Sequence, residues 1–521
     1  MSEWKATYSQ NYEDIADGLR VQKPGETFLP SEMAQAIEDI NNDISAAYTA
    51  CENKGATLPA AQVSANLART INSIPADGGT TADFYDFAGN LVRSCTADEI
   101  AALSELPDAP VIEGFTFQEW NWTLSGIKSW AAAAESGHLC VGGVYVTADG
   151  HTRIRMKFTE PRMSVVAMPF CIQQIAGTVL IDWGDNSAPE TITAAGVYYH
   201  TWNLNTYPAN VVIDIQYTPS GTTKLVLGHA VGSTMYGLFN NDPLYAKCVQ
   251  AVELGENIDF LQYSATFKNC QDLNRINIPA SVKTISHNMF QSCDNLGFVV
   301  VPSGLSHIEN NAFAGCTNLR LTALPSGLSS IGNYAFYGCT NLSLTALPSG
   351  ITSVGNYAFY GCTNLRLTAL PSGVTSIGTN AFQNCTNLGL TALPSGVTSI
   401  NANAFRGCTN LGLTSLPSGV TSINANAFYG CTNLGLTSLP SGVTSIGTNA
   451  FNGCTTLYII DLTAFTNPQS IPTLANINAF QNIPTQAQFL VAHQSMYDAF
   501  TTATNWSTYA SRFRIKPNGG I

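Results

Sequence analysis

Charged side chains are scarce in this 521-residue sequence and almost absent from much of its C-terminal half. They make up 11% of the chain, and residues 301–460 hold only Glu309, Arg320, Arg366 and Arg406. The formal net charge of −13 is therefore carried elsewhere. Because binding to nucleic acid needs a basic footprint, this acidic composition argues against a nucleic-acid partner.

Motifs for catalysis, membrane insertion and secretion are also missing. The 7 histidines are scattered, and none lies in H-E-x-x-H or beside a motif nucleophile. There is no P-loop, no G-x-G-x-x-G segment and no apolar run long enough to span a membrane. The stretch Met1–Tyr8 lacks the basic and apolar regions of a signal peptide. We therefore expect a protein without enzymatic activity, cofactor or membrane span, made in the cytoplasm. A carboxylate pair assembled in space would leave no such motif, so a glycan-degrading enzyme stays open.

What the chain does contain is a 23-residue repeat over residues 279–457, of which Leu370–Ala392 is one copy. Cysteine recurs with this period at positions 270, 293, 316, 339, 362, 385, 408, 431 and 454. Phenylalanine recurs with it at positions 267, 290, 313, 336, 359, 382, 405, 428 and 451. This period is typical of a leucine-rich solenoid, in which each coil buries its apolar edge against its neighbours.

The recurring apolar positions are predicted to point inward and to form ladders from coil to coil. In the copy above they are Leu370, Val374, Ile377, Phe382, Cys385, Leu388 and Leu390. Leu388 and Leu390 lie two residues apart, as on one face of a strand, so this segment is predicted to be one rung of a parallel sheet. Asn387 is predicted to bond to backbone groups at a bend.

The cysteine ladder is interpreted as a column of buried free thiols that pack as small hydrophobes. Side chains in a ladder hold their Cβ vectors parallel, whereas a disulfide needs them to converge. The close ligand spacing of a zinc site, such as C-x₂-C, does not occur. We therefore expect neither disulfides nor a metal in the repeats.

The segment Ile377–Leu388 has the pattern Ile-Gly-x-x-Ala-Phe-x-x-Cys-x-x-Leu. This pattern resembles the BspA-like leucine-rich repeats of bacterial surface proteins and of proteins encoded by phages of gut bacteria. That family usually continues with Leu-x-x-Ile-x-Ile-Pro. Here the chain runs Leu388-Gly-Leu-Thr-Ala-Leu393-Pro394, so the rung is predicted to be shifted or bulged.

The first 50 residues are predicted to be a helical segment. In it, Ile15–Arg20 and Glu32–Ile40 resemble the N-terminal motif of many phage and prophage tail proteins. The apolar residues from Met33 to Ala47 are spaced as in a short heptad seam. The helix therefore either packs on its own domain or forms an oligomer seam.

Residues 51–82 are predicted to hold a second short helical motif and a linker. The stretch Thr57–Pro75 resembles a companion motif of the same tail proteins. Together the two resemblances imply that the N-terminal region attaches to other phage tail or baseplate proteins. By analogy they also imply a homo-oligomer, with a trimer suspected.

Residues 83–157 are predicted to be a small α+β module. Phe84–Val92 has a strand–turn–strand signature, and Thr96 is placed to cap a helix. Trp120 and Trp122 alternate, so one of them is expected in a core rather than at a ligand. The order of these segments also resembles gut-phage tail-associated proteins.

Residues 158–227 are predicted to be a β-sandwich. Val179–Ser187, with the strand-like segments that follow, resembles a PKD-like domain. Asn186 stands where that family usually has glycine, but asparagine tolerates a left-handed turn. The carboxylates that could suggest calcium are Asp182, Asp185 and Glu190. They lack the twelve-residue loop of an EF-hand, so no metal is expected.

The predicted fold class is thus multi-domain and mainly β. A leucine-rich-repeat solenoid with a parallel sheet occupies residues 228–460, and residues 461–521 form its C-terminal cap. The PKD-like β-sandwich, the small α+β module and the N-terminal helical segment precede it.

Two positions vary between otherwise similar coils, the residue before Ala-Phe and the residue after it. Because they accept Tyr, Gln, Arg and Asn, they are predicted to face water. The candidate ligand-binding residues are Tyr334, Tyr337, Tyr357, Tyr360, Arg320, Arg366, Arg406 and Tyr429. Tyrosine offers a large contact area with a polar tip, which suits a sugar or protein surface. Alternatively, these tyrosines only shield strand edges.

Three functional hypotheses follow. The first is a tail fibre or receptor-binding protein of a phage or prophage virion, whose solenoid meets a glycan or protein on the host surface. The second is a bacterial surface or secreted adhesin that uses the same array. The third is a tail-associated enzyme that degrades host glycans. Fold alone does not choose between them.

Overall fold

The computed structural model describes residues 80–516, apart from short gaps at 87–90, 134–136, 160–166, 175, 203, 205–206, 223, 232–233, 237, 240–242, 261–264 and 322. Residues 80–521 form one compact unit. The helical segment, the heptad spacing and the two tail-protein motifs predicted for residues 1–76 lie outside the described residues. The first strand begins at Thr80, within the stretch expected to be a linker.

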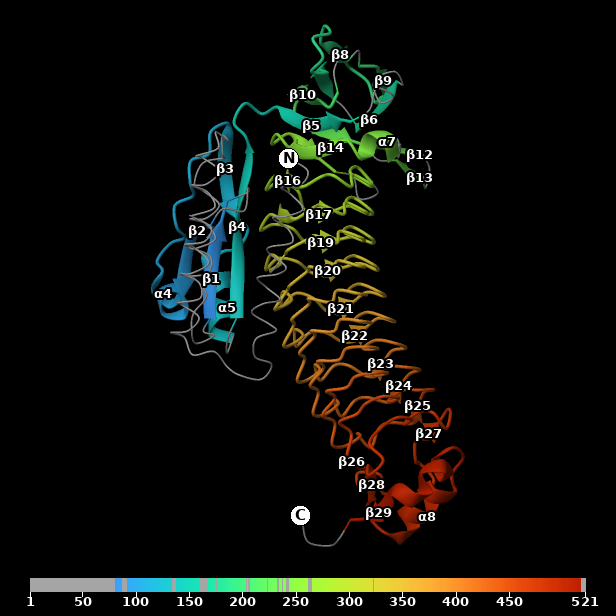
Figure 1. Cartoon of the computed structure of the whole chain (residues 1–521). Helices are drawn as coiled ribbons and strands as arrows, with labels where there is room; N and C mark the ends of the chain where they lie inside the picture. The colour runs from blue at the N-terminus through green and yellow to red at the C-terminus, as the bar shows by residue number, and fades with distance from the viewer. Residues whose placement is uncertain are drawn as a thin grey trace, which may run out of the picture. The chain divides into compact units, whose positions relative to one another are not determined.

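The N-terminal part of this unit is an α+β module (Figure 1). Its elements are β1 (Thr80–Tyr85), β2 (Leu91–Thr96), α4 (Ala97–Ala102), β3 (Phe115–Trp120), α5 (Leu124–Ala133) and β4 (Gly137–Thr147). The sheet has the order β2-β1-β4-β3, in which β1 and β4 are parallel. The predicted helix cap is confirmed, because Thr96 and Glu99 form a capping box at the start of α4. The strand–turn–strand prediction is confirmed by the antiparallel pair β1 and β2.

A β-sandwich follows the module. Its strands are β5 (Thr152–Phe158), β6 (Met168–Gln174), β7 (Gly177–Asp182), β8 (Glu190–Ile192), β9 (Gly196–His200), β10 (Ala209–Pro219), β11 (Leu225–Leu227) and β15 (Ile258–Asp259). One sheet contains β5-β10-β7-β8 and the other has the order β15-β11-β6-β9. Aromatic side chains join them, since Phe170 on β6 contacts Trp183 with ring centroids 5.5 Å apart. Asn186 has the φ of +65° that was expected of it. Strand β5 begins inside the range assigned to the preceding module.

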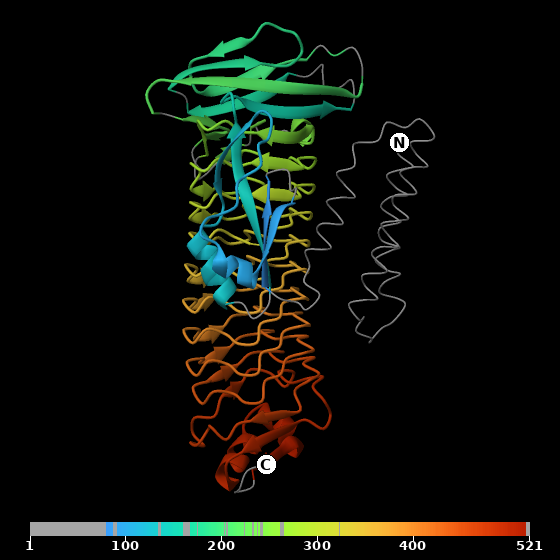
Figure 2. The same cartoon turned by 90° about the vertical axis from the view of Figure 1, so that its left-hand side faces the viewer.

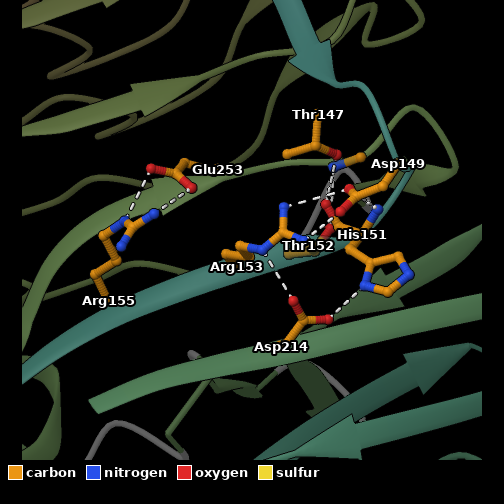
Figure 3. A network of polar contacts seen from close by, with 9 residues as sticks. Thr147, Asp149, His151, Thr152, Arg153, Arg155, Asp214 and Glu253 are labelled. Carbon is orange, nitrogen blue, oxygen red and sulfur yellow. Dashed lines mark hydrogen bonds and ion pairs between the residues drawn. The ribbon is translucent and has the colours of Figure 1, made fainter. Parts of the chain in front are cut away.

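The first sheet of the sandwich continues directly into the solenoid. Strand β14 (Val249–Glu253) pairs antiparallel with β5 and parallel with β16 (Arg275–Asn277), which pairs with β18 (Phe298–Val300). A polar network reinforces this junction (Figure 3). In it, the buried Glu253 on β14 accepts hydrogen bonds from Arg155 on β5 at 2.9 and 3.1 Å. The sandwich therefore covers the edge that an unpaired first coil would expose.

A second part of the same network crosses from β5 to β10. Asp214 on β10 lies 2.6 Å from His151 Nδ1 and 2.9 Å from Arg153 Nε. Arg153 also pairs with Asp149, and its hydrogen bond holds the pKa of the Asp149 carboxyl below its usual value. These charged groups satisfy one another, which indicates a structural network rather than a reactive centre.

Short elements link the sandwich to the coils and close the far end. The linking elements are β12 (His229–Val231), β13 (Thr234–Tyr236) and α7 (Pro243–Ala246). The closing elements are β26 (Ile459–Asp461), β28 (Gln488–Val491), α8 (Gln494–Thr502), the 3₁₀ helix η1 (Trp506–Arg512) and β29 (Phe513–Ile515). Trp506 is buried and packs on Phe480, the last phenylalanine of the internal stack. The predicted strand and helix of the C-terminal cap are thus confirmed (Figures 1 and 2).

Between the two ends, the coils stack into a parallel solenoid, as predicted (Figure 2). Each rung is a strand of two residues. The rungs are β17 (Thr284–Ile285), β19 (His307–Ile308), β20 (Ser330–Ile331), β21 (Ser353–Val354), β22 (Ser376–Ile377), β23 (Ser399–Ile400), β24 (Ser422–Ile423), β25 (Ser445–Ile446) and β27 (Thr473–Leu474). From β17 to β22 and from β23 to β25, each paired residue lies 23 positions from its partner.

The predicted rung at Leu388–Leu390 was wrong. Both side chains are buried, but this segment is not a strand. In the first coil, the buried side chains of Ile276 in β16 and of Ile278 directly after it lie two residues apart, as the alternation of a strand requires. In the middle coils, Ile278 corresponds to the buried Leu393, whereas Ile276 corresponds to the exposed Thr391, and the nearest buried side chain before Leu393 is Leu390, three residues away. This spacing breaks the alternation of side chains that a strand requires. The strand that recurs from coil to coil is instead the Ser-Ile pair, as in β22.

Inside the coils, the phenylalanines form one continuous stack. Neighbouring rings from Phe267 to Phe480 lie 5.0–5.8 Å apart between centroids, with interplanar angles of 1–16°. The ladder cysteines are buried free thiols, as predicted. From Cys293 onward, each thiol donates to the carbonyl of the phenylalanine 26 residues earlier, at 2.9–3.1 Å. The cysteine therefore fills a small apolar site and also joins adjacent coils.

Asn387 was predicted to bond to backbone groups, but its side chain has another hydrogen-bond partner. Its side-chain amide donates to Asn364 Oδ1 at 3.4 Å, and Asn364 donates in the same way to Asn341. Because the coils stack in register, each amide lies over the amide of the coil before it. Such asparagine ladders are typical of stacked parallel strands.

We expect the ladder thiols to be unreactive while the protein is folded. Burial raises the pKa of all these thiols, that of Cys454 to about 12, so thiolate is scarce at neutral pH. A thiol reagent should titrate few groups in the native protein and all 14 cysteines after denaturation without reductant. A shortfall after denaturation would contradict the assignment of free thiols.

Candidate ligand-binding surface

The surface with the two variable positions lies at one turn of each coil. The residue before Ala-Phe has φ between +54° and +58° in every coil from Asn311 to Asn449. Asparagine tolerates this left-handed conformation better than other non-glycine residues, which explains why it predominates here. Two residues after the phenylalanine, glycine holds the second positive φ of most coils, as Gly338 and Gly361 do. Most of these variable side chains are partly or largely exposed, but Ala314, Asn380 and Asn452 are buried, so the prediction that both positions face water is confirmed only for part of the coils.

Four tyrosines gather on two adjacent coils of this surface. The rings of Tyr334 and Tyr357 stack with centroids 4.6 Å apart, and those of Tyr337 and Tyr360 stack at 4.7 Å. Within each coil the two rings lie 5.8 and 5.9 Å apart. Tyr334 and Tyr337 are 37% and 38% exposed. We call these four side chains the tyrosine surface.

Tyr334 and Tyr357 occupy the left-handed position, with φ of +57° and +55°. A bulky residue pays roughly 1–2 kcal/mol for this conformation, whereas the neighbouring coils carry asparagine at the same position. Strained backbone of this kind concentrates at functional sites. The aromatic residues at these two positions are therefore not the choice that backbone stability alone would favour.

The arginines predicted to bind a ligand lie in two different segments of the coil. Arg406 occupies the same coil position as Tyr337, and its guanidinium lies 5.0 Å from the ring centroid of Tyr429 in a cation–π contact. Arg320 and Arg366 instead follow the leucine of Cys-x-x-Leu, where the backbone N–H of Arg320 bonds to Gly297 in the previous coil. Arg406 and Tyr429 thus extend the variable column, while Arg320 and Arg366 belong to another segment of the coil.

The three carboxylates that could suggest a calcium site in the sandwich each contact a neighbouring protein group. Asp185 lies 2.9 Å from His200 Nε2, and Asp182 accepts the backbone N–H of Gly184 at 2.9 Å. Glu190 accepts the indole N–H of Trp183 at 3.3 Å. Among the described residues, no group of three or more potential ligands is arranged to hold a metal ion. Glu309, the carboxylate of the middle coils, lies 3.4 Å from His287 Nδ1.

The expectation that one tryptophan of the pair Trp120 and Trp122 lies in a core was incomplete, because both are buried. Strand β3 ends at Trp120, so strand alternation does not extend to Trp122. The indole of Trp120 donates to the carbonyl of Pro107 at 2.9 Å. The indole N–H of Trp122 is buried without a hydrogen-bond partner among the described residues, which typically costs about 1–3 kcal/mol.

The comparisons with known proteins bear on the coils. Residues 262–389 and 390–488 match the family described as BspA type leucine rich repeat region, with 6 copies. These residues are BspA-type leucine-rich repeats, as their pattern predicted. No curated protein matches the chain significantly. None of the helices in the part of the chain that the structure describes is long and apolar enough to cross a membrane.

Several solved structures are similar to the coils. A leucine-rich repeat protein from Bacteroides ovatus is 20% identical over 58% of this chain and 97% of its own, with a TM-score of 0.28. A leucine rich cell surface protein from Faecalibacterium prausnitzii is 21% identical over 57% and 92%, with a TM-score of 0.33. The pneumococcal vaccine antigen PcpA is 19% identical over 51% and 75%, with a TM-score of 0.32.

Proposed function

We propose that this protein, with BspA-type repeats over residues 262–488, is a non-enzymatic receptor-binding protein of a phage or prophage tail. Its solenoid recognises a glycan or protein on the surface of the bacterial host. The observation that carries the binding role is the tyrosine surface, where two tyrosines occupy left-handed positions that asparagine fills in neighbouring coils. Stacked, partly exposed tyrosines give a rigid contact area with polar tips.

The tail assignment rests on the sequence resemblances outside the coils. The motifs within residues 1–76 resemble those of phage tail proteins, and by the same resemblance they attach the protein to the tail or baseplate, with a trimer as the inferred assembly.

We further infer that the sandwich is PKD-like, because the Trp183-Gly-Asp185 motif lies after β7 and two sheets enclose an aromatic core. The alternative function is a bacterial surface adhesin, which the same BspA-type repeats support.

Purified phage or induced prophage particles provide the test of the tail assignment. Mass spectrometry should detect the full-length protein in particles. Deletion of residues 1–76 should leave the repeat unit in the cell lysate and remove it from particles. Absence of the full-length protein from particles would contradict the tail role and favour the adhesin. Normal incorporation of the truncated protein would contradict the attachment role of residues 1–76.

A further inference from the structure

A second surface, distinct from the tyrosines, lies where the α+β module meets the coils. Strand β3 is fixed to two successive Pro-x-x turns of the solenoid. Gln118 Oε1 accepts the backbone N–H of Ala280 at 2.8 Å. Glu119 Oε1 accepts the backbone N–H and the hydroxyl of Ser303 at 3.0 and 2.9 Å. Ala280 and Ser303 occupy equivalent positions in successive coils, so neighbouring residues of β3 contact the same turn in two neighbouring coils.

Among the described residues, no such hydrogen bond from β3 reaches the next two turns, although the module still packs there, since Ala323 belongs to its hydrophobic core. The positions equivalent to Ala280 and Ser303 are Ser326 and Ser349, but β3 ends at Trp120 and α5 begins only at Leu124. A cavity of about 460 Å³ lies at this point, between the start of α5 and the turns of two coils. This volume falls within the roughly 300–1,000 Å³ of typical small-molecule sites.

The wall of this cavity combines indole rings with hydroxyl groups. Trp122 and Trp130 line it from the module, together with Ser129. Ser326, Thr345 and Ser349 line it from the coils. None of the described residues that line the cavity is charged. The hydroxyls of these serines and of Thr345 make no hydrogen bond to other described residues, so they are free to bind a ligand.

We propose that this cavity binds a neutral saccharide. The apolar faces of indole rings suit the C–H faces of a pyranose ring. Hydroxyl groups, each of which both donates and accepts, suit the hydroxyls of a sugar. The absence of charge in the lining disfavours acidic sugars and phosphorylated ligands, since these need a cationic partner when they are desolvated.

The saccharide site is independent of the tyrosine surface and of the tail assignment. The tyrosines lie at the Ala-Phe turns, whereas the cavity is lined by the Leu-Pro-Ser-Gly turns and by the module. Binding to the cavity can therefore be tested on the purified full-length protein without any host cell or particle. Failure of either site leaves the other unaffected.

The test is calorimetric titration of the full-length protein with neutral trisaccharides, namely maltotriose, cellotriose, mannotriose and N,N′,N″-triacetylchitotriose, and with trigalacturonic acid as an acidic control. We expect saturable binding of at least one neutral trisaccharide and none of the acidic one. Ser349→Trp should fill the cavity and weaken binding at least tenfold. Ser372→Trp places the same side chain on the equivalent exposed turn one coil further along, outside the cavity, and should bind like the parent.

A variant in which the tyrosine surface is replaced should also bind the trisaccharide like the parent. The proposal is overturned if no neutral trisaccharide binds, or if Ser349→Trp and Ser372→Trp bind equally well. It is also overturned if the replacement of the tyrosines abolishes the signal, because the sugar would then occupy that surface. Melting curves of both tryptophan variants confirm that each is folded before it is titrated.

Discussion

Phe382→Ala should destabilise the solenoid by about 3–5 kcal/mol, the usual cost of removing a buried phenylalanine. Phe382 is completely buried and lies between Phe359 and Phe405, with ring centroids at 5.5 and 5.7 Å. Its loss leaves a cavity inside the stack and weakens the contact with both neighbouring coils. Because the stability of a solenoid depends on these nearest-neighbour interfaces, the defect disrupts both halves of the array. Urea and thermal unfolding measure the change.

Gln383→Ala is the matched control, one residue further along the same turn. Gln383 is half-buried and accepts a hydrogen bond from Asn380 Nδ2 at 2.9 Å. The loss of this bond should cost at most about 1 kcal/mol. Equal destabilisation by the two substitutions would mean that the inward and outward sides of the turn have been assigned incorrectly.

Replacement of the whole tyrosine surface should abolish binding to the host while the protein stays folded. The substitutions Tyr334→Asn, Tyr357→Asn, Tyr337→Gln and Tyr360→Gln introduce residues found at the same positions in other coils. The loss of ring stacking, worth about 0.5–1.5 kcal/mol per pair, is offset by relief of the left-handed strain, which is of similar size. Melting temperatures should therefore remain close to that of the parent.

Adsorption to host cells or to their wall polysaccharide measures the effect on binding. Central tyrosines of an interface commonly contribute more than 1 kcal/mol each, so we expect adsorption to weaken at least tenfold. The control is the double variant Arg320→Ser and Arg366→Ser, which introduces the serine found at the equivalent position 343. These arginines lie in another segment of the coil, and the control should adsorb normally. If the fourfold variant adsorbs like the parent, the tyrosines only shield the turn.

The sequence predicts the interior of the coils well, because a strict period assigns each residue the same environment in every copy. The phenylalanine and cysteine ladders follow from this directly. The position of the rung could not be read from Leu388 and Leu390 alone, since it depends on the next buried side chain, Leu393, and on which backbone groups of adjacent coils meet.

Contacts between distant segments could not be predicted from sequence patterns. Arg155 and Glu253 are 98 residues apart, and their pairing across β5 and β14 merges the sandwich with the first coil. Glu119 and Ser303 are 184 residues apart. Neither contact leaves a local pattern, because each depends on how whole elements dock. The cavity beside Trp122 was missed for the same reason.

The near-identity of the middle coils also has a genetic consequence. Each coil presents to the next one the same phenylalanine, thiol and amide contacts that it receives from the one before. Unequal recombination between such repeats in the gene would add or delete whole coils without creating any new kind of interface. Each such event changes the length of the array by about 4.8 Å, the spacing of neighbouring strands. A change in copy number would therefore alter the reach of the protein while both ends stay unchanged.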